Sequence, residues 1–401
     1  MSAMARDESA QVTLLCSRFR PERYGGVEER LWHVASALAR RGRRVEVLTE
    51  NRTGAPADEM FEPGLHVFRF EPFDPGRLWR WFHAAQVRWW YRTLKAHPPQ
   101  GNVLWAADPM MATAAILAGY RRQLVFNPAA CAAGMTHIGR FHEQVTTMQL
   151  PRSLVRIDRF AYLRSPVVLV SSENVKKQFE RFYGPHPSLH VCRYGVELSD
   201  NLPARADVRR RMGLASDAFV AGFIGRLDPC KGIEYLFEAA RLMGLHADDR
   251  LLIIGDGSDE ARLREIASRL GIEQHVVWLG RLDDPSAICP AMDVLVLPSM
   301  YEAFGLVLLE GMAAGLPVIG RADDPEMSFT ASREIISDGV TGFVTDAREP
   351  SSLAEKLQWL RAHPDERRSM GGRARLQAST RNWDALIEEY LAVVPDLGER
   401  S

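Results

Sequence analysis

The chain has 401 residues, of which 46% are apolar and 25% are charged, and its formal net charge is -1 at pH 7. This length can bury two hydrophobic cores, so we expect two domains. A net charge near zero provides no overall attraction for polyanions, which argues against nucleic acid as a partner. Residues 1–10 lack the apolar core of a signal peptide, and no uncharged apolar run approaches the roughly 18 residues that span a bilayer. We therefore expect a cytoplasmic protein.

The cysteines give no sign of a metal site or of a disulfide framework. There are five of them, widely scattered, with no Cys-x-x-Cys pair and no Cys/His cluster at metal-ligand spacing. This pattern suits a reducing compartment. The residues concerned are Cys16, Cys131, Cys192, Cys230 and Cys289.

The first half of the chain alternates between expected strands and expected helices. Between most of the strands lie helical patterns such as residues 27–42, which carry apolar side chains at i, i+3, i+4 and i+7 and end on Gly42. This alternation is typical of a parallel sheet covered by helices. Short runs rich in apolar and β-branched residues predict strands at 11–16, 44–50, 65–70, 102–106, 123–127 and 167–171.

A polar loop at 192–208 interrupts this pattern, which then restarts. We therefore expect an α/β chain of two Rossmann-like, doubly wound domains, 1–195 and 196–380, which face a cleft. Ligands are expected at the carboxyl ends of the strands, in that cleft. The second set of strands is predicted at 218–225, 250–255, 275–280, 293–298, 316–320 and 341–345.

Three strand-to-helix loops could hold a phosphate. Gly25 and Gly26 precede the helix at 27–42 and allow close approach of a ligand to the backbone. Arg226 and Lys231 lie in a second loop, where two cations could converge on one anion. The third loop contains Gly255 at the end of its strand. Taken singly, each loop is also compatible with a plain turn or a solvated charge.

The stretch 301–319 places Glu302 and Glu310 in an otherwise apolar segment. A helix is expected to begin near Gly305, so that its positive end would attract a diphosphate. The flanking carboxylates could then accept hydrogen bonds from hydroxyl groups, which is the layout of a nucleoside diphosphate sugar. The alternative is structural: Glu302 caps the helix and Glu310 forms an ion pair.

Together these motifs resemble those of a known family. The stretches "YGGVEE", "GRLDPCKG", "IIGDG", "LPSMYEAFGLVLLEGMAAGLPVI" and "EIISDGVTGFV" occur in the order and roughly the spacing found in retaining glycosyltransferases of the GT-B fold, especially glycosyltransferase family 4. The resemblance covers about residues 11–394. It implies that the chain's last segment, 381–401, forms a helix that crosses back to the first domain.

The resemblance also implies roles for individual residues. Arg226 and Lys231 would bind the donor diphosphate and stabilise it as it leaves, Glu302 would contact a sugar hydroxyl, and these three would be the catalytic residues. The donor-binding residues would be Gly25, Gly26, Gly255, Leu282, Phe304, Gly305, Leu306 and Glu310, with Glu310 on the ribose and Leu282 near the base.

The implied reaction is a retaining transfer from a UDP- or GDP-type sugar to a hydroxyl acceptor, without a metal or any other cofactor. The cations and the helix end would offset the charge that develops on the diphosphate. In the reaction proposed for this family, the leaving phosphate oxygen takes the acceptor proton.

The sequence departs from the family near the donor sugar. Many relatives carry a histidine close to the end of the strand at 123–127, whereas here the equivalent position is Asn127. Asparagine cannot titrate, so the site relies on leaving-group chemistry or uses His137 or His142 instead. Asn127 and His137 are therefore candidate sugar or acceptor contacts, and a structural role for either histidine stays open.

Residues 77–95 are both basic and aromatic, with their cations within an arc of about 120° on a helical wheel. Such a helix could contact an anionic membrane as a peripheral anchor, pack its aromatic side chains on the sheet, or line an acceptor pocket. Two other functions also remain open on this fold, namely a sugar-nucleotide isomerase and a noncatalytic nucleotide-binding protein. A related transferase would couple a pseudo-sugar to an amine.

Overall fold

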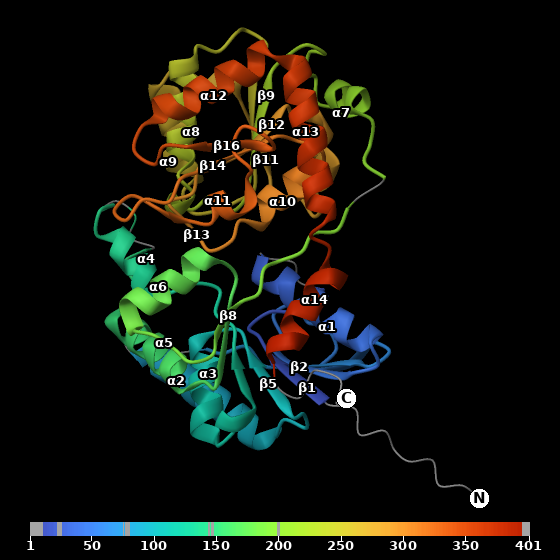
Figure 1. Cartoon of the computed structure of the whole chain (residues 1–401), viewed down its shortest axis with the longest axis vertical. Helices are drawn as coiled ribbons and strands as arrows, with labels where there is room; N and C mark the ends of the chain where they lie inside the picture. The colour runs from blue at the N-terminus through green and yellow to red at the C-terminus, as the bar shows by residue number, and fades with distance from the viewer. Residues whose placement is uncertain are drawn as a thin grey trace, which may run out of the picture.

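The computed structural model describes residues 11–21, 26–74, 76, 81–142, 145, 148–198 and 201–394. Its strands form two large sheets, one in each of two lobes, with the first lobe below and the second above in Figure 1. In both lobes, strands and helices mostly alternate along the chain, as the sequence predicts. None of the helices in these ranges is long and apolar enough to cross a bilayer.

The first lobe is built on an eight-stranded sheet in the order β3-β4-β2-β1-β5-β6-β7-β8. Six of its strands confirm the prediction to within one or two residues: β1 (Gln11–Leu15), β2 (Arg44–Glu50), β4 (Leu65–Phe70), β5 (Val103–Ala106), β6 (Leu124–Phe126) and β7 (Val167–Val170). Two edge strands were not predicted, β3 (Asp58–Glu62) and β8 (Leu189–Val191). β3 is antiparallel to β4 and half exposed, so its sequence lacks the apolar signal of a buried strand.

Helices cover both faces of this sheet because alternate residues of each strand point to opposite sides. Leu14 and Trp105 face a core that also contains α1 (Gly26–Arg40), whereas Leu15 and Leu104 face a second core. The helices of this second layer are α2 (Phe82–Ala96), α3 (Pro109–Ala118), α5 (Arg152–Arg164) and α6 (Glu173–Tyr183), with α4 (Ala132–Gly139) between α5 and α6.

The second lobe contains a six-stranded parallel sheet in the order β11-β10-β9-β12-β14-β16. All six strands were predicted: β9 (Val220–Ile224), β10 (Arg250–Ile254), β11 (Val276–Gly280), β12 (Val294–Leu297), β14 (Val318–Arg321) and β16 (Gly342–Thr345). A separate pair of short strands, β13 (Tyr301–Glu302) and β15 (Phe329–Thr330), was not. The helices are α7 (Arg205–Arg211), α8 (Ile233–Met243), α9 (Glu260–Arg269), α10 (Leu306–Ala313), α11 (Ser332–Ile335), α12 (Pro350–Ala362) and α13 (Pro364–Ser379).

The last helix, α14 (Trp383–Val393), lies on the first lobe beside α1, as its red colour in the lower half of Figure 1 shows. Its Tyr390 is fully buried in the core that α1 shares with the first sheet. The Tyr390 hydroxyl donates to the carbonyl oxygens of Cys192 and Arg193, at 3.2 and 3.1 Å. The chain therefore passes between the lobes twice, once on either side of the second sheet's sequence.

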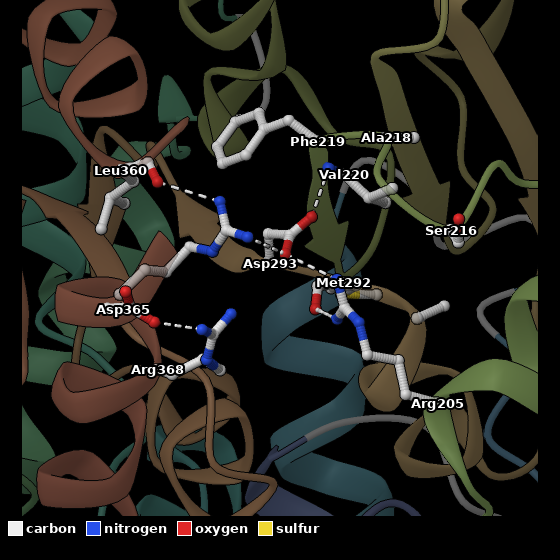
Figure 2. Close-up of polar contacts among 12 residues, drawn as sticks. Arg205, Ser216, Ala218, Phe219, Val220, Met292, Asp293, Leu360, Asp365 and Arg368 are labelled. Carbon is white, nitrogen blue, oxygen red and sulfur yellow. Dashed lines mark hydrogen bonds and ion pairs between the residues drawn. The ribbon is translucent and has the colours of Figure 1, made fainter. Parts of the chain in front are cut away.

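A buried cluster of charges joins α7 and α13 to the second sheet (Figure 2). Asp293 precedes β12 and is 4% exposed. Its carboxylate accepts hydrogen bonds from the backbone N–H of Val220 and from Arg209, both at 2.8 Å, and forms ion pairs with Arg205 and Arg367 at 2.6 and 2.8 Å. Because this buried carboxylate is paired with guanidinium groups and a backbone donor, its charge is compensated in the interior.

The lobes also touch across the cleft through Tyr301, which lies on β13 and is buried among residues of the first lobe. Its hydroxyl accepts from the N–H of Cys131 and donates to the Oε1 of Gln178, each at 3.0 Å. Nearby, the carboxylate of Glu334 accepts from the backbone N–H groups of Glu173 and Asn174, at 2.9 Å each, at the start of α6. These contacts hold one side of the cleft closed.

Candidate active site

A cavity of about 610 Å³ lies between the two lobes, at the carboxyl ends of β9 and β10. The first lobe lines it with the start of α1, and the second lobe lines it with α10 and the loop after β11. Of the candidate site residues, the cavity walls include Gly26, Arg226, Gly255, Leu282, Leu306 and Glu310. Gly25 lies outside the described residues. Candidate residues from four of the five quoted motifs, together with Leu282, therefore line one cavity.

Close packing of two neighbouring loops explains why residue 255 is a glycine. Its backbone φ of 135° is one that side-chain-bearing residues rarely adopt, and a Cβ there would lie 1.9 Å from the carbonyl oxygen of Gly225. Only glycine lets the loops after β9 and β10 run this close together. The result is a wall of exposed backbone, which leaves room for a ligand.

Two helix N-termini meet across the cleft. Gly26 begins α1, and a Cβ built on it would lie 3.8 Å from the Cβ of Leu306, the first residue of α10. Gly305 precedes Leu306 with a left-handed φ of 96°, so α10 begins where the sequence predicts. The first N–H groups of a helix have no acceptor within it, and the helix dipole makes this end positive. Two such ends therefore place partial positive charge on facing walls of the cavity.

The cations of the predicted diphosphate site lie on the loop after β9. Asp228 accepts a hydrogen bond from the N–H of Cys230 at 3.0 Å, which fixes the turn that carries Lys231. The Nζ of Lys231 lies 2.6 Å from a carboxylate oxygen of Glu302. Burial lowers the pKa of Lys231, but Glu302 outweighs it and the pKa lies above its ordinary value. Lys231 is thus held as a cation beside the start of α10.

Arg226 differs from Lys231 in its surroundings. Its side chain is 55% exposed in the cavity, and its guanidinium lies 4.0 Å from Asp228. A guanidinium this open can still turn toward an anion in the cavity. Glu302 also accepts from the hydroxyl of Ser299 at 3.3 Å, so two partners hold its carboxylate in the absence of a ligand.

Glu310 lies about one turn into α10 and lines the cavity, and its carboxyl group makes no hydrogen bond to any described residue. Burial raises its pKa to about 7, and the neighbouring carboxylates of Glu29 and Asp284 add to this effect. The predicted structural alternative, in which Glu310 forms an ion pair, is therefore wrong for the described residues. Its carboxyl group is available to a ligand.

Phe304 contributes no side chain to the cavity. It is 2% exposed, and its ring packs on that of Tyr194, with centroids 4.8 Å apart. The carbonyl oxygen of the preceding residue, Ala303, accepts from Ser172 at 2.6 Å across the lobe boundary. Phe304 therefore anchors the loop that leads into α10.

Asn127 is not positioned as a sugar contact. It is fully buried, where its Oδ1 accepts from the indole N–H of Trp105 at 3.2 Å and its Nδ2 donates to the carbonyl of Leu169 at 2.6 Å. Its backbone carbonyl accepts from Arg30 at 3.2 Å. The Asn127 amide therefore links the neighbouring strands β5 and β7. Contrary to our expectation, this side chain does not point to a ligand position.

His137 is occupied by a contact between the lobes. It lies on α4, its Nε2 is 2.9 Å from the carbonyl oxygen of Pro325, and its ring stacks on Phe329 with centroids 5.8 Å apart. His142 makes a similar contact with the carbonyl of Met327 at 2.9 Å. Because a carbonyl oxygen can only accept, both Nε2 atoms donate. Neither histidine lines the cavity, so His137 serves the lobe interface instead.

A further wall of the cavity, formed by His33 and Trp383, was not predicted. His33 on α1 lines the cavity, and its ring stacks on Trp383 of α14 at 4.7 Å, nearly parallel. The ring nitrogens of His33 lie 3.3 Å from Glu29 and 3.4 Å from Glu197. Trp383 is 350 residues away in sequence and no local pattern connects the two. Among the residues that the structure describes, no group of three or more His, Cys, Asp or Glu could hold a metal ion.

Two family models match the chain, one in each lobe. Residues 24–200 match Glycosyltransferase Family 4, and residues 204–377 match Glycosyl transferases group 1. The matches divide the chain near the polar loop at 192–208, and together they contain nearly all of the cavity residues.

Similar proteins include D-inositol 3-phosphate glycosyltransferases. That of Thermomonospora curvata is 34% identical over 241 residues, which cover 54% of this chain and 54% of the relative, about half its length. That of Gordonia bronchialis is 27% identical and covers 92% of this chain and 83% of the relative.

Solved structures show the same fold. The sucrose-phosphate synthase of Thermosynechococcus elongatus is 20% identical with a TM-score of 0.83, covering 97% of this chain and 99% of that one. The Anabaena protein HepE, solved in complex with UDP-glucose, is 21% identical with a TM-score of 0.72, covering 96% of this chain and 99% of that one. At these identities the likeness establishes the fold, two Rossmann-like domains in the GT-B arrangement.

Proposed function

The chain belongs to the family 4 glycosyltransferases of the GT-B fold, and from this premise we propose that it moves a sugar from a nucleoside diphosphate sugar to a hydroxyl acceptor. The observation that carries the proposal is the meeting of two helix N-termini at Gly26 and Leu306, with Arg226 in the same cavity wall. Lys231 lies on the loop that follows Arg226 and is paired with Glu302. The two helix ends and Arg226 supply positive charge in a cavity whose other walls carry several carboxylates. A diphosphate is the part of such a donor that would occupy the position between the two helix ends.

The donor's other parts fit the two sides of this position. Glu310 lies deeper along α10 and offers an unpaired carboxyl group, which suits the ribose hydroxyls. The backbone around Leu282 would meet the base. Glu302 would accept a hydrogen bond from a sugar hydroxyl. Because Lys231 already contacts this carboxylate, the hydroxyl would share it with Lys231. HepE, which shares the fold, has been solved with UDP-glucose, and this supports a nucleotide sugar as the donor.

We further propose that the reaction retains the anomeric configuration and uses no metal cofactor. The bond between the anomeric carbon and the diphosphate oxygen breaks, and the acceptor oxygen bonds to the same face of that carbon. The acceptor proton passes to the departing phosphate oxygen. Arg226, Lys231 and the helix ends supply preorganised positive charge for the leaving group, a role that a divalent cation fills in other enzymes.

The first experiment measures thermal stability with UDP, GDP, ADP and dTDP, each with and without EDTA. A saturating nucleotide at about 100 times its Kd should stabilise the folded protein by roughly 2.7 kcal/mol. A shift with one nucleotide that EDTA leaves unchanged supports the proposed donor site and its metal independence. No shift with any of the four argues against the site.

The matching nucleotide sugar is then incubated with a panel of hydroxylated acceptors, and the anomeric configuration of the product is read by NMR. Retention supports the mechanism, and inversion overturns it. Conversion of the donor without acceptor would instead identify an isomerase. Binding without any conversion would support a noncatalytic protein.

A further inference from the structure

Two helices of the first lobe expose arginine and lysine side chains along their outer surfaces. α2 carries Arg88, Arg92 and Lys95, and α5 carries Arg152, Arg156 and Arg159, all six of which are exposed. We call these six residues the basic face. The basic and aromatic pattern at 77–95 predicted a helix here, and α2 covers its described part, whereas residues 77–80 lie outside the described ranges. The basic residues of α5 were not singled out from the sequence.

Contacts at both ends make the two helices one continuous surface. At the start of each helix, the Nδ1 of His83 lies 3.1 Å from the hydroxyl of Ser153. At the other end, both helices meet the end of α3, where Lys95 donates to the carbonyl of Ala118 at 3.1 Å and Arg121 donates to that of Arg164 at 2.8 Å. α2 and α5 therefore run in the same direction, and both pack on α3.

Acidic side chains are sparse in the stretch that carries α2 and α5, although exposed carboxylates flank it at Glu71, Asp74, Glu173 and Glu180. Within the described part of 81–172, the acidic residues are Asp108 and Asp158, and neither is exposed. Asp158 is 1% exposed and points inward, where it accepts from the N–H of Ala132. The whole chain is nearly neutral, so this region concentrates positive charge that is offset elsewhere. A single-sign field of this kind attracts an extended anionic partner.

Large apolar side chains are exposed next to the cations. Trp81 is 70% exposed at the start of α2, and Leu117 and Leu163 are 58% and 41% exposed near the ends of α3 and α5. Tyr91, on α2 between Arg88 and Arg92, is 36% exposed. Aromatic and aliphatic groups among cations are the composition of a surface that inserts shallowly below lipid headgroups. Nucleic acid would use the cations but gives Leu117 and Leu163 no partner.

Helix stability explains only part of the pattern. Cations in the last turn of a helix interact favourably with its negative end, which accounts for Lys95 and Arg164. It does not account for Arg152 in the first turn of α5, where a positive charge is unfavourable, nor for Arg88 and Arg156 in the middle of their helices.

We propose that the basic face docks the protein on an anionic lipid bilayer, with Trp81, Leu117 and Leu163 entering the headgroup layer. The proposal rests on the charge and exposure of these helices and stands whether or not the cavity transfers a sugar. The lipid phosphates neutralise the cations, and the apolar side chains lose contact with water.

The test is co-sedimentation with vesicles of phosphatidylcholine, with and without phosphatidylglycerol, at low and high salt. We expect binding only to the anionic vesicles, and weaker binding at high salt. A triple variant Arg152→Gln, Arg156→Gln and Arg159→Gln should lower the partition coefficient about a hundredfold, since each surface cation contributes about fivefold. Trp81→Ser should make the remaining binding more sensitive to salt.

The matched control is the triple variant Arg210→Gln, Arg264→Gln and Arg368→Gln in the second lobe, where each side chain is more than half exposed. It should bind vesicles like the wild type. Equal binding to neutral vesicles, equal loss in both triple variants, or binding to a single-stranded oligonucleotide but not to vesicles would each overturn the proposal. If the first triple variant does not fold, the proposal is tested by how wild-type binding to the two kinds of vesicle depends on salt. Binding to the anionic vesicles that does not weaken at high salt would then overturn it.

Discussion

The Nζ of Lys231 lies 2.6 Å from the carboxylate of Glu302, although the two residues are 71 positions apart. The loop after β9 and the strand β13 meet near the start of α10, so the pair lies close to the position that we propose for the diphosphate. In the free protein each charge is compensated by the other. A bound donor must therefore replace this contact with two of its own, a phosphate for Lys231 and a hydroxyl for Glu302.

Lys231→Ala should abolish transfer while leaving the fold intact. Loss of one preorganised charge at a transition state typically lowers kcat by about 10²- to 10³-fold. We expect a loss of that size in a steady-state assay with the matching nucleotide sugar. The control is Lys356→Ala on α12, whose ammonium lies over the ring of Phe343 away from the cavity. Turnover of the Lys231 variant equal to that of the control would remove the proposed mechanism.

Glu310→Gln should change how stability depends on pH. Burial raises the pKa of Glu310 from its ordinary value of 4.5 to about 7, so between these values the folded protein keeps a proton that the unfolded chain releases. Stability from this group therefore falls as pH rises from about 4.5 to 7, by at most about 3 kcal/mol. Glutamine cannot ionise.

Melting curves at pH 5, 6, 7 and 8, in the absence of ligand, measure this effect. The Tm of Glu310→Gln relative to the wild type should increase with pH and level off above about pH 8. A difference that stays constant across this range would show that Glu310 is not held protonated by its surroundings.

Asp293→Ala should destabilise the second lobe. Removal of the carboxylate leaves the buried guanidinium of Arg209, which is 3% exposed, without its counter-charge, and such losses cost about 3–5 kcal/mol. Urea unfolding measures the change. The control is Asp365→Ala, because the exposed pair of Asp365 and Arg368 should contribute no more than about 1 kcal/mol. Equal, small effects in both variants would contradict the role of the buried cluster.

Gly232→Ala should damage both stability and activity, whereas Gly213→Ala should have only a mild effect. Both glycines have a left-handed φ, 62° and 65°. A Cβ on Gly232 would lie 2.4 Å from the carbonyl oxygen of Pro298, whereas one on Gly213 would meet nothing within 4 Å. The strain of φ alone costs about 1 kcal/mol.

The clash at Gly232 adds to that strain and displaces the neighbouring Lys231. For Gly232→Ala, both the free energy of unfolding measured with urea and kcat should therefore fall. For Gly213→Ala, only the free energy of unfolding should fall, and only slightly. Similar behaviour of the two variants would mean that the loop after β9 can shift without affecting the site.

Strand periodicity predicted the two large sheets, and the motifs at strand ends predicted six of the residues that line the cavity. A buried parallel strand needs a continuous apolar run, which β9, β10 and β12 have and the half-exposed β3 lacks. Glycines at strand ends mark where two backbones must approach, which is why Gly255 was found.

Contacts between distant segments could not be predicted in this way. Asn127 follows its strand at the edge that faces the cleft, but its side chain turns back between β5 and β7, and only the packed sheet fixes that direction. The stacking of His33 on Trp383 depends on where α14 lands on the first lobe. Such pairs leave no periodic trace in the sequence.

The return of α14 to the first lobe also determines the order in which the molecule can be completed. Tyr390 and Ile387 fill the same core as Leu14 and Trp105, although Ile387 follows Trp105 by 282 positions. On the ribosome, the second lobe has all of its strands before the first lobe has its last helix. Part of the first lobe's core therefore stays open to water until the second lobe has been synthesised and α14 follows it.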